Sequence, residues 1–328
     1  MMRDHYIFSN GRLKRKHNTV YFENESGIEK PLPIEKLRAL HLFGEIDVNS
    51  KLLNYLSQYG ILLHFYNYYG FYAGTYYPRD RKESGHVIVK QSEHYLDPGK
   101  RMFMAYQFLN GAVHHMLRNL RRHKDATRQQ VEAIEDLWGV MQHARDIQQL
   151  MGLEGQIRQI YYQAFNEIVK QDFVFKKREK QPPKDPLNAL ISFGNTLMYQ
   201  TILAETYKTP LNPTISYLHE PSLKRFSLCL DLAEIFKPLL VDPLIFTLIN
   251  KRIITPKHFD YLEGEICFLN EEGRKKLIDN WEERLETTVK HRSLNRNVSY
   301  RFMIRLECYK IIKHVIGDEI YKPLKAWW

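Results

Sequence analysis

The spacing of the apolar residues changes once along this chain, and that change limits the fold more than any other feature. Up to about residue 86, short runs rich in Tyr, Phe, Leu and Ile alternate with turn residues, which is typical of β-strands. From Gln91 onward the apolar residues recur at helical spacing. We therefore predict an α+β protein, with a small N-terminal β-rich domain over residues 1–86 and a larger all-α C-terminal domain over residues 87–328.

The first domain is predicted to contain five strands and one helix. The strands are expected at residues 6–8, 19–23, 37–43, 61–66 and 71–77, and the helix at 49–58. The pair Asn10-Gly11 lies between the first two strands and predicts a hairpin, because both residues accept positive φ.

The second domain is predicted to contain eight helices. They are expected at about 99–123, 126–149, 152–171, 186–207, 222–237, 239–250, 270–289 and 297–315. Between two of them, prolines and charges exclude a regular helix from Lys176 to Pro186 and predict a mobile, basic loop.

The charge balance predicts a polyanionic partner. Forty-eight Lys and Arg residues against 38 Asp and Glu residues give a formal net charge of +10, which favours nucleic acid first and an anionic membrane second. No run approaches the ~18 apolar residues that span a bilayer, and charges within the first five residues exclude a signal peptide. We expect a cytoplasmic protein that does not enter membranes. Its three cysteines are far apart in sequence and are expected to be reduced core thiols.

The segment from Pro221 to Pro238 is an apolar stretch that carries one polar stripe. Prolines bracket it, Ser222 is placed to cap its first turn, and apolar residues cover most of its circumference, which predicts a buried helix. The polar stripe, at steps of three, four and three, consists of Lys224, Ser227, Asp231 and Glu234.

The two carboxylates of this stripe require a positive charge nearby. At positions i and i+3 in an apolar setting they repel each other and lose hydration. One interpretation is pairing with Lys224 or Arg225, or a stripe that faces water. The other is a divalent-metal site that takes further ligands from elsewhere in the chain.

His219 lies three residues before this helix. Glu220 precedes a proline and is biased away from helical φ and ψ, so His219 is expected in the entry turn, next to the stripe. A capping or core histidine is the alternative. With Asp231 and Glu234 following, His219 becomes a candidate metal ligand.

Glu154 is the third candidate, because Gly152 and Gly155 flank it. Each glycine costs a helix roughly 1 kcal/mol relative to alanine, which a surface helix has no reason to accept. Close approach by another backbone, or by a bulky ligand such as DNA, supplies a reason. The alternative is an N-terminal capping glutamate paired with Arg158.

One imidazole and two or three carboxylates form a hard ligand set. Such a set suits Mg²⁺ or Mn²⁺ rather than structural zinc, and Mn²⁺ tolerates the imidazole better. The natural chemistry of that ion beside a nucleic acid is phosphoryl transfer.

Two basic segments are expected to contact DNA. Residues 100–130 carry seven Lys or Arg and one acidic residue, and residues 274–328 carry thirteen against seven with aromatic residues interleaved. Solvated helix faces are the alternative. The candidate DNA contacts are Arg118, Arg121, Arg122, Arg158, Lys224, Arg292, Arg296 and Arg301. Trp327 and Trp328 close the sequence and are expected to dock or bind, because exposed rings are costly.

Three segments resemble one known family, the Cas one endonuclease and integrase of CRISPR spacer acquisition. The first likeness is a Gly-x-Glu-Gly-x-x-Arg-x-x-Tyr pattern, and the others are a Leu-His pair and a Ser-Leu-x-x-Asp-Leu-x-Glu-x-Phe-Arg-Pro helix. The matching residues are Gly152, Glu154, Gly155, Arg158 and Tyr161, then Leu218 and His219, then Ser227, Leu228, Asp231, Leu232, Glu234, Phe236 and Pro238. Lys237 stands at the usual arginine, and Ser216 stands where a glycine is usual. Residues 188–199 resemble a further stretch of the family.

The resemblance implies a fold, a site and partners. It implies Glu154, His219 and Glu234 as ligands of Mn²⁺ or Mg²⁺, with Asp231 as an auxiliary carboxylate, in a helical domain that follows a β domain. It implies insertion of foreign DNA fragments, double-stranded and possibly branched, into a CRISPR array. It also implies a homodimer joined through the β domains and assembly with a small Cas two dimer.

Two other functions compete with this interpretation. A non-enzymatic DNA-binding protein explains the charge but not three ligand-type segments. A metal-dependent hydrolase of small nucleotides explains the ligand set but not two long basic surfaces.

Overall fold

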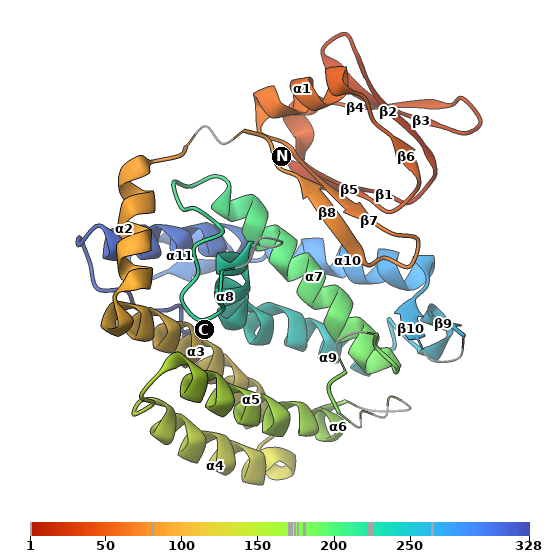
Figure 1. Ribbon diagram of the computed structural model, residues 1–328. Coiled ribbons are helices and arrows are strands. Elements are labelled where there is room, and N and C mark those ends of the chain that lie inside the picture. The colour runs from red at the N-terminus through yellow and green to blue at the C-terminus, as the bar shows by residue number, and fades with distance from the viewer. Residues whose placement is uncertain are drawn as a thin grey trace. The chain divides into compact units, whose positions relative to one another are not determined.

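The protein folds as two compact units. The structure is a computed structural model that describes residues 2–79, 82–169, 173, 175, 177–179, 182–221, 226–263 and 266–328. The units are Met1–Arg81 and Lys82–Trp328. The first holds two four-stranded sheets and the second holds most of the helices (Figure 1). The predicted α+β class, with a β-rich unit before a helical one, is confirmed.

The first unit consists of eight strands and one α-helix within its described residues. One sheet has the order β1-β5-β7-β8 and the other has the order β4-β3-β2-β6. Helix α1 (Ser50–Tyr59) begins after Asn49, whose side chain accepts a hydrogen bond from the Leu52 amide at 3.0 Å, and ends at Gly60 with φ of 65°. The strands are β1 (Arg3–Ile7), β2 (Gly11–Lys16), β3 (Thr19–Asn24), β4 (Glu29–Leu32), β5 (Leu37–Leu42), β6 (Ile46–Asp47), β7 (Leu62–Tyr66) and β8 (Tyr72–Tyr76).

The hairpin predicted at Asn10-Gly11 is wrong. β1 pairs in parallel with β5, and β2 belongs to the other sheet. The hairpin joins β2 to β3 instead and turns at His17, which has φ of 53°. Gly11 has φ of 154°, and a Cβ there would lie 2.2 Å from the carbonyl oxygen of Glu23. The close approach of β3 therefore requires this glycine, not a tight turn.

The second unit is built mainly from helices. Two short hairpins, β9 (Phe259–Leu262) with β10 (Ile266–Leu269) and β11 (Thr288–His291) with β12 (Arg296–Ser299), are additions that the sequence did not predict. The helices are α2 (Gly85–Leu96), α3 (Pro98–Arg121), α4 (Lys124–Met141), α5 (Ile147–Gln163), α6 (Phe165–Ile168), α7 (Pro186–Thr206), α8 (Ser227–Phe236), α9 (Asp242–Asn250), α10 (Glu271–Glu286) and α11 (Tyr300–Val315).

Helix α5 begins earlier than predicted, and this changes the position of Glu154. The side chain of Asp146 accepts a hydrogen bond from the Gln149 amide at 2.7 Å and starts the helix at Ile147. The predicted helix over 126–149 therefore crosses a real break. Glu154 lies in the middle of α5 and is not an N-terminal capping residue.

Helix α8 is the centre of the second unit and packs against α3 and α7 (Figure 1). Its apolar residues other than the partly buried Leu230 are buried, as predicted from their distribution around the helix. The predicted first turn over residues 222–225, with the Ser222 cap, lies outside the described residues. After Phe236 the chain continues as the π-helical segment η2 (Lys237–Val241), because Pro238 has no amide to complete an α-helical turn.

The remaining predictions for the second unit concern thiols and membranes. Cys229, Cys267 and Cys308 are buried and free of disulfides, as expected for core thiols. In the part of the chain that the structure describes, no helix is both long enough and apolar enough to span a bilayer.

Candidate functional site

Helices α5 and α8 bring Glu154 and Glu234 to one guanidinium. Nε of Arg158 donates to Oε1 of Glu154, one helical turn earlier on α5. Nη2 of the same arginine forms an ion pair with Oε2 of Glu234 on α8. Two of the three predicted metal ligands are therefore gathered around a positive charge, which the chain itself supplies through Arg158.

A second cation lies on the other side of Glu234. Nζ of Lys237 is 2.9 Å from Oε1 of Glu234, three residues earlier in the chain. Burial, and after it the neighbouring positive charge of Arg158, lowers the pKa of Lys237 to about 7. The side chains of Arg158 and Lys237 thus repel each other beside the carboxylate of Glu234, which is only 4% exposed.

Asp231 holds His219 and the backbone around it. Oδ2 of Asp231 accepts from the amides of Tyr217 at 2.7 Å and Leu218 at 3.0 Å. Oδ1 accepts from the His219 amide at 3.0 Å and from Nδ1 of its ring at 2.8 Å. With Nδ1 engaged, the ring presents Nε2, the arrangement that proteins use to orient a metal-binding imidazole. The fully buried Asp231 therefore fixes the backbone of residues 217–219 and the orientation of the His219 ring.

The segment that carries His219 is held from two further sides. The hydroxyl of Ser216 donates to the His219 carbonyl at 2.6 Å. Nε of Arg101, on α3, donates to the Tyr217 carbonyl at 2.9 Å. The His219 side chain is nonetheless 22% exposed, so a ligand can reach its ring from solvent.

The donor atoms of the predicted ligands suit a divalent cation, but the three side chains do not lie around one common point. Among the described residues, no three His, Cys, Asp or Glu side chains lie close enough together to hold a metal. The Arg158 guanidinium lies between the two glutamates. Oε2 of Glu234 is buried and forms an ion pair with this guanidinium. A buried carboxylate requires a cation beside it, and within the described chain Arg158 and Lys237 supply that charge.

The two glycines beside Glu154 face open space. A Cβ built at Gly152 or Gly155 meets nothing within 4 Å in the described structure. Approach of another backbone was one of the two reasons predicted for these glycines, and it is wrong. The other reason, space for a bulky ligand such as DNA, stays a prediction.

A buried hydrogen-bond network supports α5, and the amino-acid sequence did not predict it. Nδ2 of Asn119 donates to the hydroxyl of Tyr161 at 2.9 Å, and that hydroxyl donates to Oδ2 of Asp242 at 2.9 Å. Burial raises the pKa of Asp242 to about 7. Tyr161 lies seven residues after Glu154 on the same face of α5. The network therefore ties the helix of Glu154 to α3 and α9, and only the common spacing of Glu154, Arg158 and Tyr161 hinted at it.

The predicted DNA-binding arginines occupy different environments. Arg301 is 4% exposed and pairs with Glu282 and Glu286, so it is a buried structural residue and not a surface contact. Arg121 is exposed and pairs with Glu135.

The remaining candidates lie near aromatic rings, in a pocket, or outside the described residues. Arg292 lies 4.9 Å from the ring centre of Trp327, and Arg296 lies 5.5 Å from that of Phe302, as the interleaving of basic and aromatic residues suggested. Arg118 and Arg122 line a pocket described below. Lys224 lies outside the described residues.

Comparison with known proteins gives matches over nearly the whole chain. The family model described as CRISPR associated protein Cas1 matches residues 5–283. A Clostridium perfringens protein named CRISPR-associated endonuclease Cas1 is 58% identical over the full length of both chains. A protein of the same name from Methanocaldococcus jannaschii is 45% identical over 98% of each chain. The structure of a Cas1 protein from Thermotoga maritima superposes with a TM-score of 0.90 at 40% identity, covering 98% of this chain and 100% of that one.

Proposed function

The chain belongs to the Cas1 family of CRISPR-associated proteins, and on that premise we propose that it is a DNA endonuclease and integrase that depends on a divalent metal. Its reaction is the insertion of foreign DNA fragments as new spacers into a CRISPR array. Its relatives of 58% and 45% identity carry the name endonuclease. We place the reaction at Glu154, His219 and Glu234.

The convergence of Glu154 and Glu234 on one guanidinium is the observation that carries this proposal. The two residues are 80 positions apart and lie on different helices, yet both carboxylates contact Arg158. A third donor, the His219 ring, is oriented by Asp231 on the helix of Glu234. Two carboxylates and one imidazole suit Mn²⁺ or Mg²⁺.

A bound Mn²⁺ or Mg²⁺ would polarise the phosphodiester and lower the pKa of the attacking hydroxyl or water. Glu154, Glu234 and Nε2 of His219 would hold it. Asp231 keeps the proton of the ring on Nδ1, so that Nε2 keeps its lone pair. Arg158 lies between the two carboxylates and would be available to a DNA phosphate when a cation replaces it there, since a guanidinium binds phosphate bidentately.

The water-accessible side of α5 is the surface proposed for DNA. Gly152 and Gly155 leave it without side chains next to Glu154, so a phosphodiester backbone approaches closely there. Arg118, Arg122, Arg292 and Arg296 are proposed to add phosphate contacts. We also propose a homodimer formed through residues 1–86 and assembly with a Cas2 dimer.

Replacing Gly155 with alanine is expected to change the stability of the protein and its affinity for DNA in opposite directions. The new methyl group meets nothing in the described structure, so the free energy of unfolding should rise by about 0.5–1 kcal/mol from improved helix propensity. DNA affinity should fall several-fold, because the methyl group stands where the backbone of the DNA approaches. Urea unfolding and DNA titration measure the two effects. A more stable variant with unchanged DNA affinity would place the DNA elsewhere. Gly139→Ala on α4, where a Cβ also meets nothing, is the matched control.

Strand transfer and cleavage of linear and branched DNA test the proposed reaction. With Mn²⁺ both reactions should proceed, and excess chelator should abolish them and leave DNA binding in place. A non-enzymatic DNA-binding protein predicts binding alone, with or without metal. A hydrolase of small nucleotides predicts weak binding of long duplexes with little salt dependence. Joining that persists in chelator would exclude the metal-dependent mechanism.

A further inference from the structure

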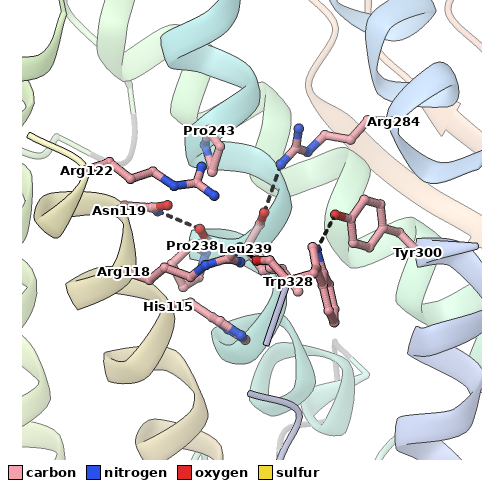
Figure 2. Close-up of a pocket in the computed structure, with 10 residues that line it drawn as sticks. All are labelled: His115, Arg118, Asn119, Arg122, Pro238, Leu239, Pro243, Arg284, Tyr300 and Trp328. Carbon is pink, nitrogen blue, oxygen red and sulfur yellow. Dashed lines mark hydrogen bonds between the residues drawn. The ribbon is translucent and has the colours of Figure 1, made fainter. Parts of the chain in front are cut away.

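A small pocket in the second unit is lined by three arginines from two helices. It has a volume of about 210 Å³ and lies between α3, the η2–α9 segment, α10 and the C-terminal residues (Figure 2). Arg118 and Arg122 come from the end of α3, and Arg284 comes from α10. Pockets for drug-sized ligands are roughly 300–1,000 Å³, so this one accommodates a single small group.

No acidic side chain compensates these three arginines in the described chain. None of the ten lining side chains is acidic, and no side-chain ion pair of Arg118, Arg122 or Arg284 occurs among the described residues; Arg118 contacts the main-chain oxygen of Trp328, the last residue of the sequence. Two other arginines of the same unit differ, since Arg301 pairs with two glutamates and Arg305 pairs with Glu205. Partly buried charges that lie close together are ordinarily paired, so this cluster has room for a further anion.

The donors of the cluster are only partly used. Nη2 of Arg284 donates to the Leu239 carbonyl at 3.1 Å, while its Nε is buried without a hydrogen-bond partner in the described structure. Arg118 donates to the carbonyl oxygen of Trp328. Burial lowers the pKa of Arg284, and Arg122 and Arg118 lower it further against an opposing effect of Tyr300. Like charges therefore lie close together in this pocket without an acidic side chain between them.

The other pocket walls are held in place and carry no competing charge. The His115 ring is buried, and burial lowers its pKa to about 3, so it is neutral. Its Nδ1 donates to the Ile235 carbonyl at 2.9 Å, and its Nε2 accepts from the Ala326 amide at 3.1 Å. Nε1 of Trp328 donates to the Tyr300 hydroxyl at 2.8 Å, closing one side of the pocket (Figure 2).

We propose that this pocket binds one phosphate group, held by Arg118, Arg122 and Arg284. Guanidinium groups bind phosphate oxygens through paired N–H donors, and the pocket volume suits a single phosphate monoester or diester. The pocket contains none of Glu154, His219 and Glu234, but it includes Arg118 and Arg122, which are also proposed to contact DNA, so this inference rests on the proposed function. If the pocket binds no phosphate, metal-dependent cleavage and joining at Glu154, His219 and Glu234 should still be observed; if that reaction is absent, phosphate binding by the pocket can still be measured.

Two neighbouring arginines at the end of α3 provide a matched test. Arg122→Gln removes a pocket donor from an exposed residue, so folding is not at risk. Arg121→Gln removes the same charge from the adjacent position, where the side chain pairs with Glu135 outside the pocket. The probes are inorganic phosphate, and a short single-stranded oligonucleotide with and without a 5′-phosphate. Calorimetry on the full chain measures binding at constant ionic strength, with chloride as the reference anion.

The expected result is a loss of affinity of about tenfold in the Arg122→Gln variant and less than about twofold in the Arg121→Gln variant. Binding of inorganic phosphate would identify a free phosphate or nucleotide as the source. Preference for the phosphorylated oligonucleotide alone would identify a nucleic acid end. Equal losses in the two variants, or no binding of any phosphate probe above chloride, would overturn the proposal.

Discussion

Alanine at Glu154, His219 or Glu234 is expected to reduce Mn²⁺-dependent cleavage and strand transfer by about a thousandfold or more. Each substitution removes one proposed ligand of the ion, and the loss of several kcal/mol of transition-state stabilisation corresponds to that factor. The rate of joining of a labelled DNA fragment to a target measures the effect.

These variants differ in their expected effect on folding. Glu154 and His219 are about one-fifth exposed, so their replacement should leave the fold and the affinity for DNA mostly intact. Glu234 is buried between Arg158 and Lys237, and its removal leaves two cations without their shared carboxylate. Glu154→Gln and His219→Ala are therefore the decisive variants.

Exposed residues of the same types provide the controls. Glu132 lies on the surface of α4, where it pairs with Arg128, and the exposed His143 lies just after that helix. Glu132→Gln and His143→Ala should keep wild-type rates. Wild-type strand transfer by a well-folded His219→Ala protein would remove His219 from the mechanism, and with it the ligand set proposed here.

Asp231→Ala is expected to destabilise the second unit by about 3–5 kcal/mol. The substitution removes a fully buried carboxylate that accepts from the amides of residues 217–219 and from the His219 ring. Breaking such a buried network leaves donors that neither water nor protein satisfies. Urea unfolding with a signal from the second unit measures the loss. Asp279→Ala, at an exposed position on α10, should change stability by less than about 0.5 kcal/mol.

The Asp231→Asn variant distinguishes positioning of His219 from simple destabilisation. The amide keeps the shape of the carboxylate but replaces one of its two acceptor oxygens with an NH2 donor group, where four donors converge. The His219 ring should therefore lose its fixed orientation. Where the protein is still folded, activity at saturating Mn²⁺ should fall ten- to a hundredfold, as for other residues that orient a metal ligand, and affinity for Mn²⁺ should fall with it. Unchanged Mn²⁺ affinity in folded Asp231→Asn would show that this carboxylate supports the backbone alone.

Local spacing predicted much of the fold and of the candidate site. The change from strand-like to helical period predicted the two kinds of unit, because side chains repeat every two residues in strands and every 3.6 in helices. The same period placed Asp231 and Glu234 on one stripe of α8 and Glu154 one turn before Arg158. Local spacing gave a wrong prediction at Gly11, because the carbonyl group of Glu23 on β3, and not a tight turn, requires this glycine. Glu23 is twelve residues away in sequence, so the residues around Gly11 do not reveal this contact.

The amino-acid sequence by itself determined the class of fold, the buried helix with its carboxylates and the set of candidate ligands, since all of these follow from the chemistry of neighbouring residues. Only the tertiary structure decided that Arg158 lies between Glu154 and Glu234, that Arg301 is buried among glutamates, and that Arg118 and Arg122 meet Arg284 beside Trp328. The physical reason is the distance along the sequence over which local patterns act. Periodicity and capping act within a few residues, as for the pair Glu154 and Arg158. The other pairings join residues from 15 to about 210 positions apart, and only the packing of whole helices brings them together.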